Sequence, residues 1–232
     1  MDGRTGAIYK QAMALRLTDH HFACHGERLP PVDESLKLDY VVAANGLFAR
    51  GRRPGIEVCM PLVTYPVSGL RAVEPYVQWG FPRLPARFLE RMLGICRKRC
   101  EKTPTEALFH LSFSDRLEQH GAGARTLDYH MGWHLEYPDQ VADENNVKPA
   151  HQGAGSSESR AVMEIHSHHH WDTKFSEKDD RDEGGNSFRV YGVLGTIFDQ
   201  PAIRMRVGLF GYFMEWSANE FFEMPPEVSP IQ

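Results

Sequence analysis

The sequence predicts an α+β or mixed α/β fold, built around one central sheet and preceded by a mainly β extension. Two observations support this prediction. One amphipathic helix, at residues 85–100, is followed by a series of segments with the apolar, β-branched and aromatic composition of strands. The chain before this helix contains strand-like runs of its own. We therefore expect an N-terminal extension or accessory domain at 1–84 and a main domain at 85–232.

The N-terminal region opens with a polar stretch in which a short helix is expected at residues 12–17. Apolar runs then predict strands at 38–44, 47–50 and 56–63. Asn45-Gly46 separates the first two runs, and this dipeptide is typical of a two-residue hairpin turn. Residues 65–85 contain several prolines and are expected to form an extended connector.

The main domain begins with its clearest element, the helix. Its apolar residues recur at helical spacing, at Phe88, Leu89, Met92, Leu93 and Cys96. Basic residues near its end suit the negative end of the helix dipole. Strands are expected at 105–113, 125–137, 161–165, 188–198 and 202–213. Residues 138–160 are rich in Pro, Asp, Asn, Gly and Ser, which predicts a loop.

The composition narrows the class of protein. The 232 residues are 41% hydrophobic and 25% charged, as in ordinary globular proteins. A net charge of -5 argues against a general nucleic-acid partner. No apolar run approaches the roughly 20 residues that cross a bilayer, and the N-terminus lacks a signal-peptide core, so we expect a cytoplasmic protein without a membrane partner. The four cysteines are then expected to be free thiols.

The histidines around residue 166 carry the main chemical signal. His166 and His168 are separated by one residue at the end of a predicted strand, where alternate side chains point to the same face. Their imidazoles can therefore converge on one ion. Asp179 follows at a distance along the chain that lets a loop fold its carboxylate back. Two histidines, one carboxylate and a water form a catalytic zinc site, and Zn2+ is the expected cofactor.

The spacing of these residues resembles the JAMM motif of the JAB/MPN family of metallopeptidases. His166, Ser167 and His168 match its opening, and Ser176 and Asp179 match its end, whereas His169 stands where the family has proline. The resemblance covers about residues 85–215. It implies a zinc metallopeptidase or isopeptidase, with a JAB/MPN-like (cytidine-deaminase-like) central mixed sheet flanked by helices.

The resemblance also implies two catalytic residues. The family's general-base glutamate lies upstream in a Pro-x-Glu context, which Pro104-Thr105-Glu106 matches, so Glu106 is the expected base. Ser176 is expected to stabilise the oxyanion by hydrogen bonding. Three other glutamates are weaker candidates for the base: Glu57, Glu136 and Glu164. Glu164 alternates with the two histidines, so a role behind the ligands is conceivable for it.

The N-terminal region, including residues 40–46, resembles a family encoded in the bacterial PRTRC gene system. The neighbouring proteins of that system are ubiquitin-like, E2-like and ThiF/E1-like. The resemblance therefore implies a substrate or conjugate that ends in a ubiquitin-like tail, and E1-like and E2-like proteins as partners. We expect the loop 138–160 to flank the substrate groove, although a plain surface loop explains it equally well.

Other interpretations of the same residues stay open. The histidines could form a His-rich tract that binds metals without catalysis, and Asp180 could replace Asp179 as the ligand. The chain could also be a catalytically silent MPN-like scaffold that binds a partner. His21 and His25 form a second, smaller cluster without further ligands at a familiar spacing, which favours surface or packing roles.

Overall fold

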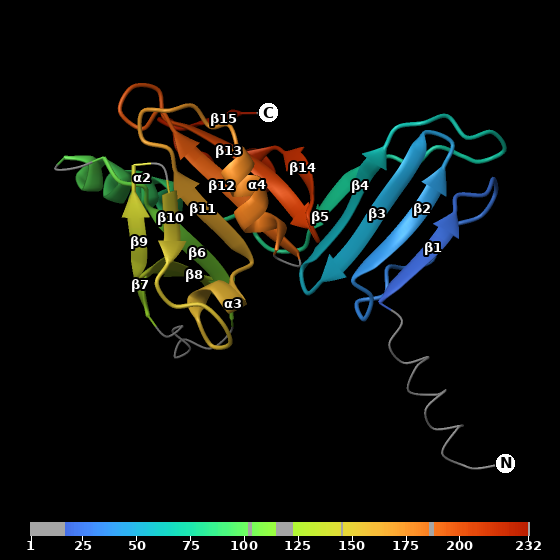
Figure 1. The fold of residues 1–232 in the computed structure, drawn as a ribbon, viewed down its shortest axis with the longest axis horizontal. Helices are drawn as coiled ribbons and strands as arrows, with labels where there is room; N and C mark the ends of the chain where they lie inside the picture. The colour runs from blue at the N-terminus through green and yellow to red at the C-terminus, as the bar shows by residue number, and fades with distance from the viewer. Residues whose placement is uncertain (1–16, 102–103, 115–122, 145, 186–187, 232) are drawn as a thin grey trace, which may run out of the picture. The chain divides into compact units, whose positions relative to one another are not determined.

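The computed structural model describes residues 17–101, 104–114, 123–144, 146–185 and 188–231 (Figure 1). The chain divides into two compact units, Met1–Phe81 and Pro82–Gln232. The division falls between Phe81 and Pro82, compared with the boundary between residues 84 and 85 expected from the sequence. Apart from Leu17, which is not helical, the short helix expected at 12–17 lies outside the described residues.

The first unit contains one five-stranded sheet in the order β1-β2-β3-β4-β5. Its strands are β1 (Thr18–Phe22), β2 (Leu38–Ala43), β3 (Gly46–Arg53), β4 (Ile56–Val63) and β5 (Tyr76–Trp79). β1 is parallel to β2, and the other neighbours are antiparallel. The strands expected at 38–44, 47–50 and 56–63 are present. The expected connector at 65–85 is wrong in part, because it contains β5.

The hairpin between β2 and β3 contains a glycine that the backbone geometry requires. Gly46 has φ 141°, and a Cβ at that position would lie 2.0 Å from the carbonyl oxygen of Val63. Only glycine fits this close approach of two backbones. A small apolar core forms on the sheet from Ala23, Val41, Ala43, Phe48, Cys59 and Val73. The expected hairpin is present, but its two turn residues are Ala44 and Asn45, and Gly46 is the first residue of β3, paired with Ala43.

The second unit is organised around a larger sheet in the order β14-β13-β12-β11-β6-β8-β7, with β15 paired to β13. Its strands are β6 (Leu108–Phe113), β7 (Ala124–His130), β8 (Trp133–Pro138), β11 (Met163–Ser167), β12 (Phe188–Gly195), β13 (Ala202–Leu209), β14 (Tyr212–Trp216) and β15 (Ser229–Ile231). A separate two-stranded sheet pairs β9 (Gln140–Asp143) with β10 (Asn146–Pro149). β11 lies inside the large sheet, parallel to β12 and antiparallel to β6.

The expected fold class is wrong, because strands dominate the chain and helices do not flank the sheet in the expected way. The described residues form fifteen strands, whereas they form only three α-helices and one 3-10 turn. These are α2 (Ala86–Cys100), α3 (Ser157–Arg160), α4 (Glu177–Gly184) and the turn Ala218–Glu220. Only α2 is long. The helix-flanked JAB/MPN-like architecture is therefore replaced by several mixed sheets with few helices. The one long amphipathic helix covers only residues 86–100, and strand pairing organises most of the remaining described chain.

Two segments that were expected to be single strands are hairpins. The segment 125–137 forms β7 and β8 around Met131 and Gly132, and the segment 202–213 extends into β13 and β14 around Phe210 and Gly211. The φ angles of each turn pair are positive, 47° and 88° in the first turn and 49° and 86° in the second. Asn-Gly is the dipeptide that most favours such turns, so the dipeptides Met-Gly and Phe-Gly did not predict these hairpins. The loop expected at 138–160 is also wrong in part, since it contains β9, β10 and α3.

The two longer helices of this unit contact the sheet at different places. α2 buries Phe88, Leu89, Met92, Leu93 and Cys96, the face that its periodicity predicted. α4 lies beside β12 and β13, to which it is joined by side chains of Tyr191 and Arg206 (Figure 1). None of the helices in the described part of the chain has the length and apolar character needed to cross a membrane.

Candidate metal centre

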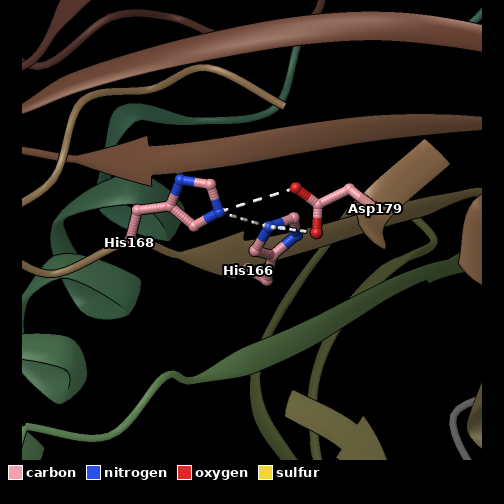
Figure 2. Close-up of side chains that lie close together, drawn as sticks. All are labelled: His166, His168 and Asp179. Atoms are coloured by element: carbon pink, nitrogen blue, oxygen red, sulfur yellow. Dashed lines mark hydrogen bonds and ion pairs between the residues drawn. The ribbon is translucent and has the colours of Figure 1, made fainter. Parts of the chain in front are cut away.

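The candidate metal centre lies at the carboxyl end of β11. His166 is on the strand itself, and His168 follows the strand's last residue. Asp179 comes from the first turn of α4. In the residues that the structure describes, these three form the one group of His, Cys, Asp and Glu side chains whose ligand atoms all lie within 4.8 Å of one another. Figure 2 shows the two imidazoles and the carboxylate directed toward a common point.

The separations of the three ligands fit a tetrahedral metal ion. Nε2 of His166 lies 3.0 Å from Nε2 of His168 and 3.4 Å from Oδ1 of Asp179. Nε2 of His168 lies 3.7 Å from Oδ2 of Asp179. Ligand atoms bound tetrahedrally to zinc at its usual bond lengths are about 3.4 Å apart. The two imidazole nitrogens and the Asp179 carboxylate are therefore close enough together to approach one zinc ion, with Oδ1 nearest His166 and Oδ2 nearest His168.

The surroundings orient His168 and favour the metal-binding protonation states of His166 and Asp179. Nδ1 of His168 lies 3.2 Å from the carbonyl oxygen of Asp172, which leaves Nε2 free to face the centre. Burial and the neighbouring His168 lower the pKa of His166 to about 4, so its imidazole is neutral at neutral pH. Burial opposes ionisation of Asp179, but His166 and the hydrogen bonds from Ser176 outweigh it and lower the pKa of this carboxyl.

We compared the chain with known families and proteins. No family model matches it, and no curated protein does. Two imidazoles and one carboxylate are the ligand set of catalytic rather than structural zinc sites, because structural sites usually have four protein ligands.

Glu106 lines the same cavity as two of the ligands. The cavity measures about 30 Å³, room for one or two waters, and is lined by Glu106, Leu108, Asn146, Val147, Glu164, His166, Lys178, Asp179, Asp182 and Glu183. Burial and the charge of Asp179 raise the pKa of Glu106 to about 8. A carboxyl group that titrates near neutral pH suits proton transfer.

The sheet explains how Glu106 reaches the ligands across 60 residues of chain. β6 is antiparallel to β11, and Leu108 is paired with His166. The backbone N–H of Ser167 donates to the carbonyl oxygen of Ala107, and the Ser167 hydroxyl accepts from the N–H of Ala107. The segment that carries Glu106 is therefore fixed beside the end of β11.

Each of the three weaker glutamate candidates has a hydrogen-bond or ion-pair partner of its own. Glu57 lies on β4 of the first unit, where it accepts a hydrogen bond from Tyr76. Glu136 is buried on β8 and accepts from Ser112 and Arg160. Glu164 does line the cavity. Burial alone would raise its pKa, but His110 and Arg189 lower it to about 2, so it remains an ionised partner of Arg189.

Ser176 contacts Asp179 in the structure, and its expected role in oxyanion stabilisation stays a prediction. It is the N-cap of α4, and its hydroxyl oxygen accepts from the N–H of Asp179 at 3.2 Å. Its own N–H and hydroxyl both donate to Oδ2 of Asp179, at 2.6 and 2.7 Å. The single hydroxyl proton is thus used to hold the metal ligand, and the remaining oxygen, Oδ1, is the one nearest His166.

The turn after the ligands accounts for the missing proline of the motif. His169 has φ 44°, which a proline ring cannot adopt. Its side chain is buried, with Nδ1 3.4 Å from Sγ of Cys100. His170 stacks on Phe198 and is exposed. Both side chains lie outside the ligand group of the described residues.

The remaining candidates for ligands have other contacts. Asp180 pairs with Arg206 at 2.5 Å and not with the histidines, so it does not compete with Asp179 here. In the N-terminal cluster, His21 lies 3.2 Å from Asp39 on the neighbouring strand. Sequence reasoning missed the Asp172 carbonyl and the buried Arg206 and Glu183. Two arginines alternating with apolar residues on one strand, Arg204 and Arg206, were the available signal for buried carboxylate partners.

Proposed function

We propose that this chain is a zinc-dependent hydrolase that cleaves a peptide or isopeptide bond. The observation that carries the proposal is the grouping of the ligand atoms of His166, His168 and Asp179 within 4.8 Å of one another. His166 and Asp179 line one cavity together with Glu106. A binding site alone needs only the three ligands. A nearby carboxyl group with a pKa of about 8 adds a group that can exchange protons at neutral pH.

Zinc bound at this site would supply a Lewis acid that lowers the pKa of a coordinated water toward about 7. Glu106 is the general base in this proposal. It accepts a proton from the attacking water, whose oxygen bonds to the carbonyl carbon, and returns that proton to the amine as the carbon–nitrogen bond breaks. His166 stays neutral and Asp179 stays ionised in this proposal, so neither of them takes part in the proton transfer.

Ser176 contributes to the same reaction by orienting Asp179. Its hydroxyl group and its N–H both donate to Oδ2, which fixes the carboxylate with Oδ1 toward His166 and Oδ2 toward His168. This role replaces oxyanion stabilisation in the proposal, because one hydroxyl proton cannot serve both acceptors at once.

The proposed substrate is the C-terminal tail of a ubiquitin-like protein, either as a precursor or as a conjugate. Support comes from the JAMM-like spacing of the ligands and from the resemblance of the N-terminal region to the PRTRC family. E1-like and E2-like proteins are the matching partners, and a cytoplasmic location with four free cysteines is compatible with them. Asn146 and Val147, from the segment 138–160, line the cavity, which fits the expectation that this segment borders the groove.

Metal content and cleavage test the proposal together. We expect about one zinc per chain in protein purified without an affinity tag, and its loss in His168→Ala and Asp179→Ala. Glu106→Gln should keep the zinc and lose turnover of a ubiquitin-like protein that carries a C-terminal fluorogenic amide, by 100-fold or more. Asp182→Asn is the matched control, because Asp182 lines the same cavity but pairs with Lys148 at the surface.

The alternative functions give different results in this experiment. A metal-binding protein without catalysis would bind zinc and show no cleavage in the wild type, and it would be indifferent to Glu106→Gln. A silent scaffold would contain no zinc. Loss of zinc from the Glu106→Gln protein would make Glu106 a ligand and would refute its role as the base.

A further inference from the structure

Arg206 is a buried charge on β13 whose hydrogen bonds go to α4, the helix that carries Asp179. Its Nε and Nη2 both donate to Oε2 of Glu183, at 2.9 and 2.6 Å. Its Nη1 donates to Oδ1 of Asp180 at 2.5 Å. Both carboxylates belong to α4, the helix that supplies Asp179. A buried arginine with this many charge-assisted hydrogen bonds fixes the position of its partners more firmly than an exposed ion pair does.

The guanidinium group is also held between two aromatic rings. Its carbon lies 3.8 Å from the ring centre of Phe175 and 3.9 Å from that of Phe213. Phe175 in turn meets the ring of His166 edge-on, with the ring centres 6.5 Å apart. Arg206 therefore contacts the surroundings of two ligands, Asp179 through α4 and His166 through Phe175.

α4 is held in place on the sheet by contacts with residues outside the helix. Of its eight residues, only Glu183 is buried, and no apolar side chain attaches the helix to the sheet. A short helix of acidic residues is marginal on its own in water. Glu183 provides the attachment: its side chain binds Arg206, and its carbonyl oxygen lies 3.3 Å from the Tyr191 hydroxyl.

We propose that Arg206 is a positioning residue for the metal centre, which sets the place of Asp179 by anchoring α4 and supports the His166 ring through Phe175. The proposal rests on the zinc site of the proposed function. It predicts that loss of the Arg206 contacts weakens zinc binding although Arg206 does not touch the metal. Residues behind metal ligands typically contribute about 10- to 100-fold to affinity.

This role is tested by the zinc dissociation constant, which is measured by competition with a chromophoric chelator. We expect Arg206→Met to weaken zinc binding at least about 10-fold. Arg206→Lys keeps the charge but not the planar group between the rings, so an intermediate loss is expected. Arg204→Met is the matched control, because Arg204 lies two residues away on the same strand and pairs with the exposed Glu215. It should leave the affinity within about threefold of wild type.

Two further measurements separate positioning from general stability. Thermal unfolding of the metal-free variants reports the fold, and the visible absorption of the cobalt-substituted protein reports the ligand geometry. A changed cobalt spectrum in Arg206→Lys supports positioning, whereas lowered stability with unchanged affinity and spectrum overturns it. If Arg206→Met does not fold, Glu183→Gln answers the same question by its zinc affinity. A wild type that binds no zinc refutes the proposed function itself, while tight binding by both wild type and Arg206→Met refutes only the role of Arg206.

Discussion

Glu106 is a residue near the candidate metal centre that binds its proton more tightly in the folded chain than in the unfolded chain. Its pKa is about 8 in the folded protein, against an ordinary value of 4.5. Between these values, the folded state keeps a proton that the unfolded state has released. This contribution to stability is present below pH 4.5 and is lost as the pH rises through 8.

The first prediction concerns Glu106→Gln in metal-free protein. Glutamine does not titrate, so the variant should gain stability relative to wild type as the pH rises from about 5 to 8.5, by at most about 4 kcal/mol. Chemical unfolding in the presence of a chelator at several pH values measures this difference. Parallel stability profiles of the two proteins would show that Glu106 ionises normally. Asp182→Asn, in the same cavity, should follow the wild type.

At the scale of elements, the cap of α4 joins helix stability to the geometry of the centre. Ser176 and Asp179 form a capping box, in which each side chain satisfies a backbone N–H of the other residue. Asp179 is at once the third residue of the helix and a candidate metal ligand. The contacts that start α4 therefore also fix the position of this candidate ligand.

The second prediction follows from this cap. Ser176→Ala should cost about 1 kcal/mol of stability, as the loss of a cap does, and should weaken zinc binding roughly 10-fold. Ser176→Thr retains a capping hydroxyl and should stay close to wild type in both. Zinc titration of the two variants provides the measurement. If Ser176→Ala keeps the zinc affinity of wild type but has reduced turnover, the result would support oxyanion stabilisation by Ser176 instead.

At the scale of the whole molecule, every candidate ligand and every support described for it belongs to the second unit. His166, His168 and Asp179 lie in it, as do Glu106 and Arg206. The first unit has its own sheet and its own small core. Metal binding and any contribution of the first unit to substrate choice are therefore expected to be separable.

The third prediction is that residues 82–232, produced alone, bind zinc with an affinity within about 10-fold of the full chain. Equilibrium zinc titration of the two proteins tests it, with residues 1–81 as the control that should bind no zinc at this level. Failure of the 82–232 protein to bind zinc, with its secondary structure intact by circular dichroism, would show that the first unit is needed to form the centre.

Local patterns in the sequence determined several parts of this protein. The spacing of Phe88, Met92 and Cys96 predicted α2 and its buried face, and Asn45-Gly46 predicted the first hairpin. His166 and His168 fall on one face because side chains alternate along a strand. These features depend on neighbours within a few residues, so composition and spacing were enough to find them.

Tertiary structure decided the rest, because the interactions involved join distant parts of the chain. The positive φ angles at Met131 and Phe210 are maintained by strand pairing, and neither residue type signals a turn. α4 has no apolar periodicity, and its place is set by contacts of Glu183 with Arg206, 23 residues away in sequence. Glu106 reaches the cavity because β6 pairs with β11. The sequence alone predicted the three candidate ligands, and only the fold placed the carboxyl group of Glu106 and the guanidinium group of Arg206 near them.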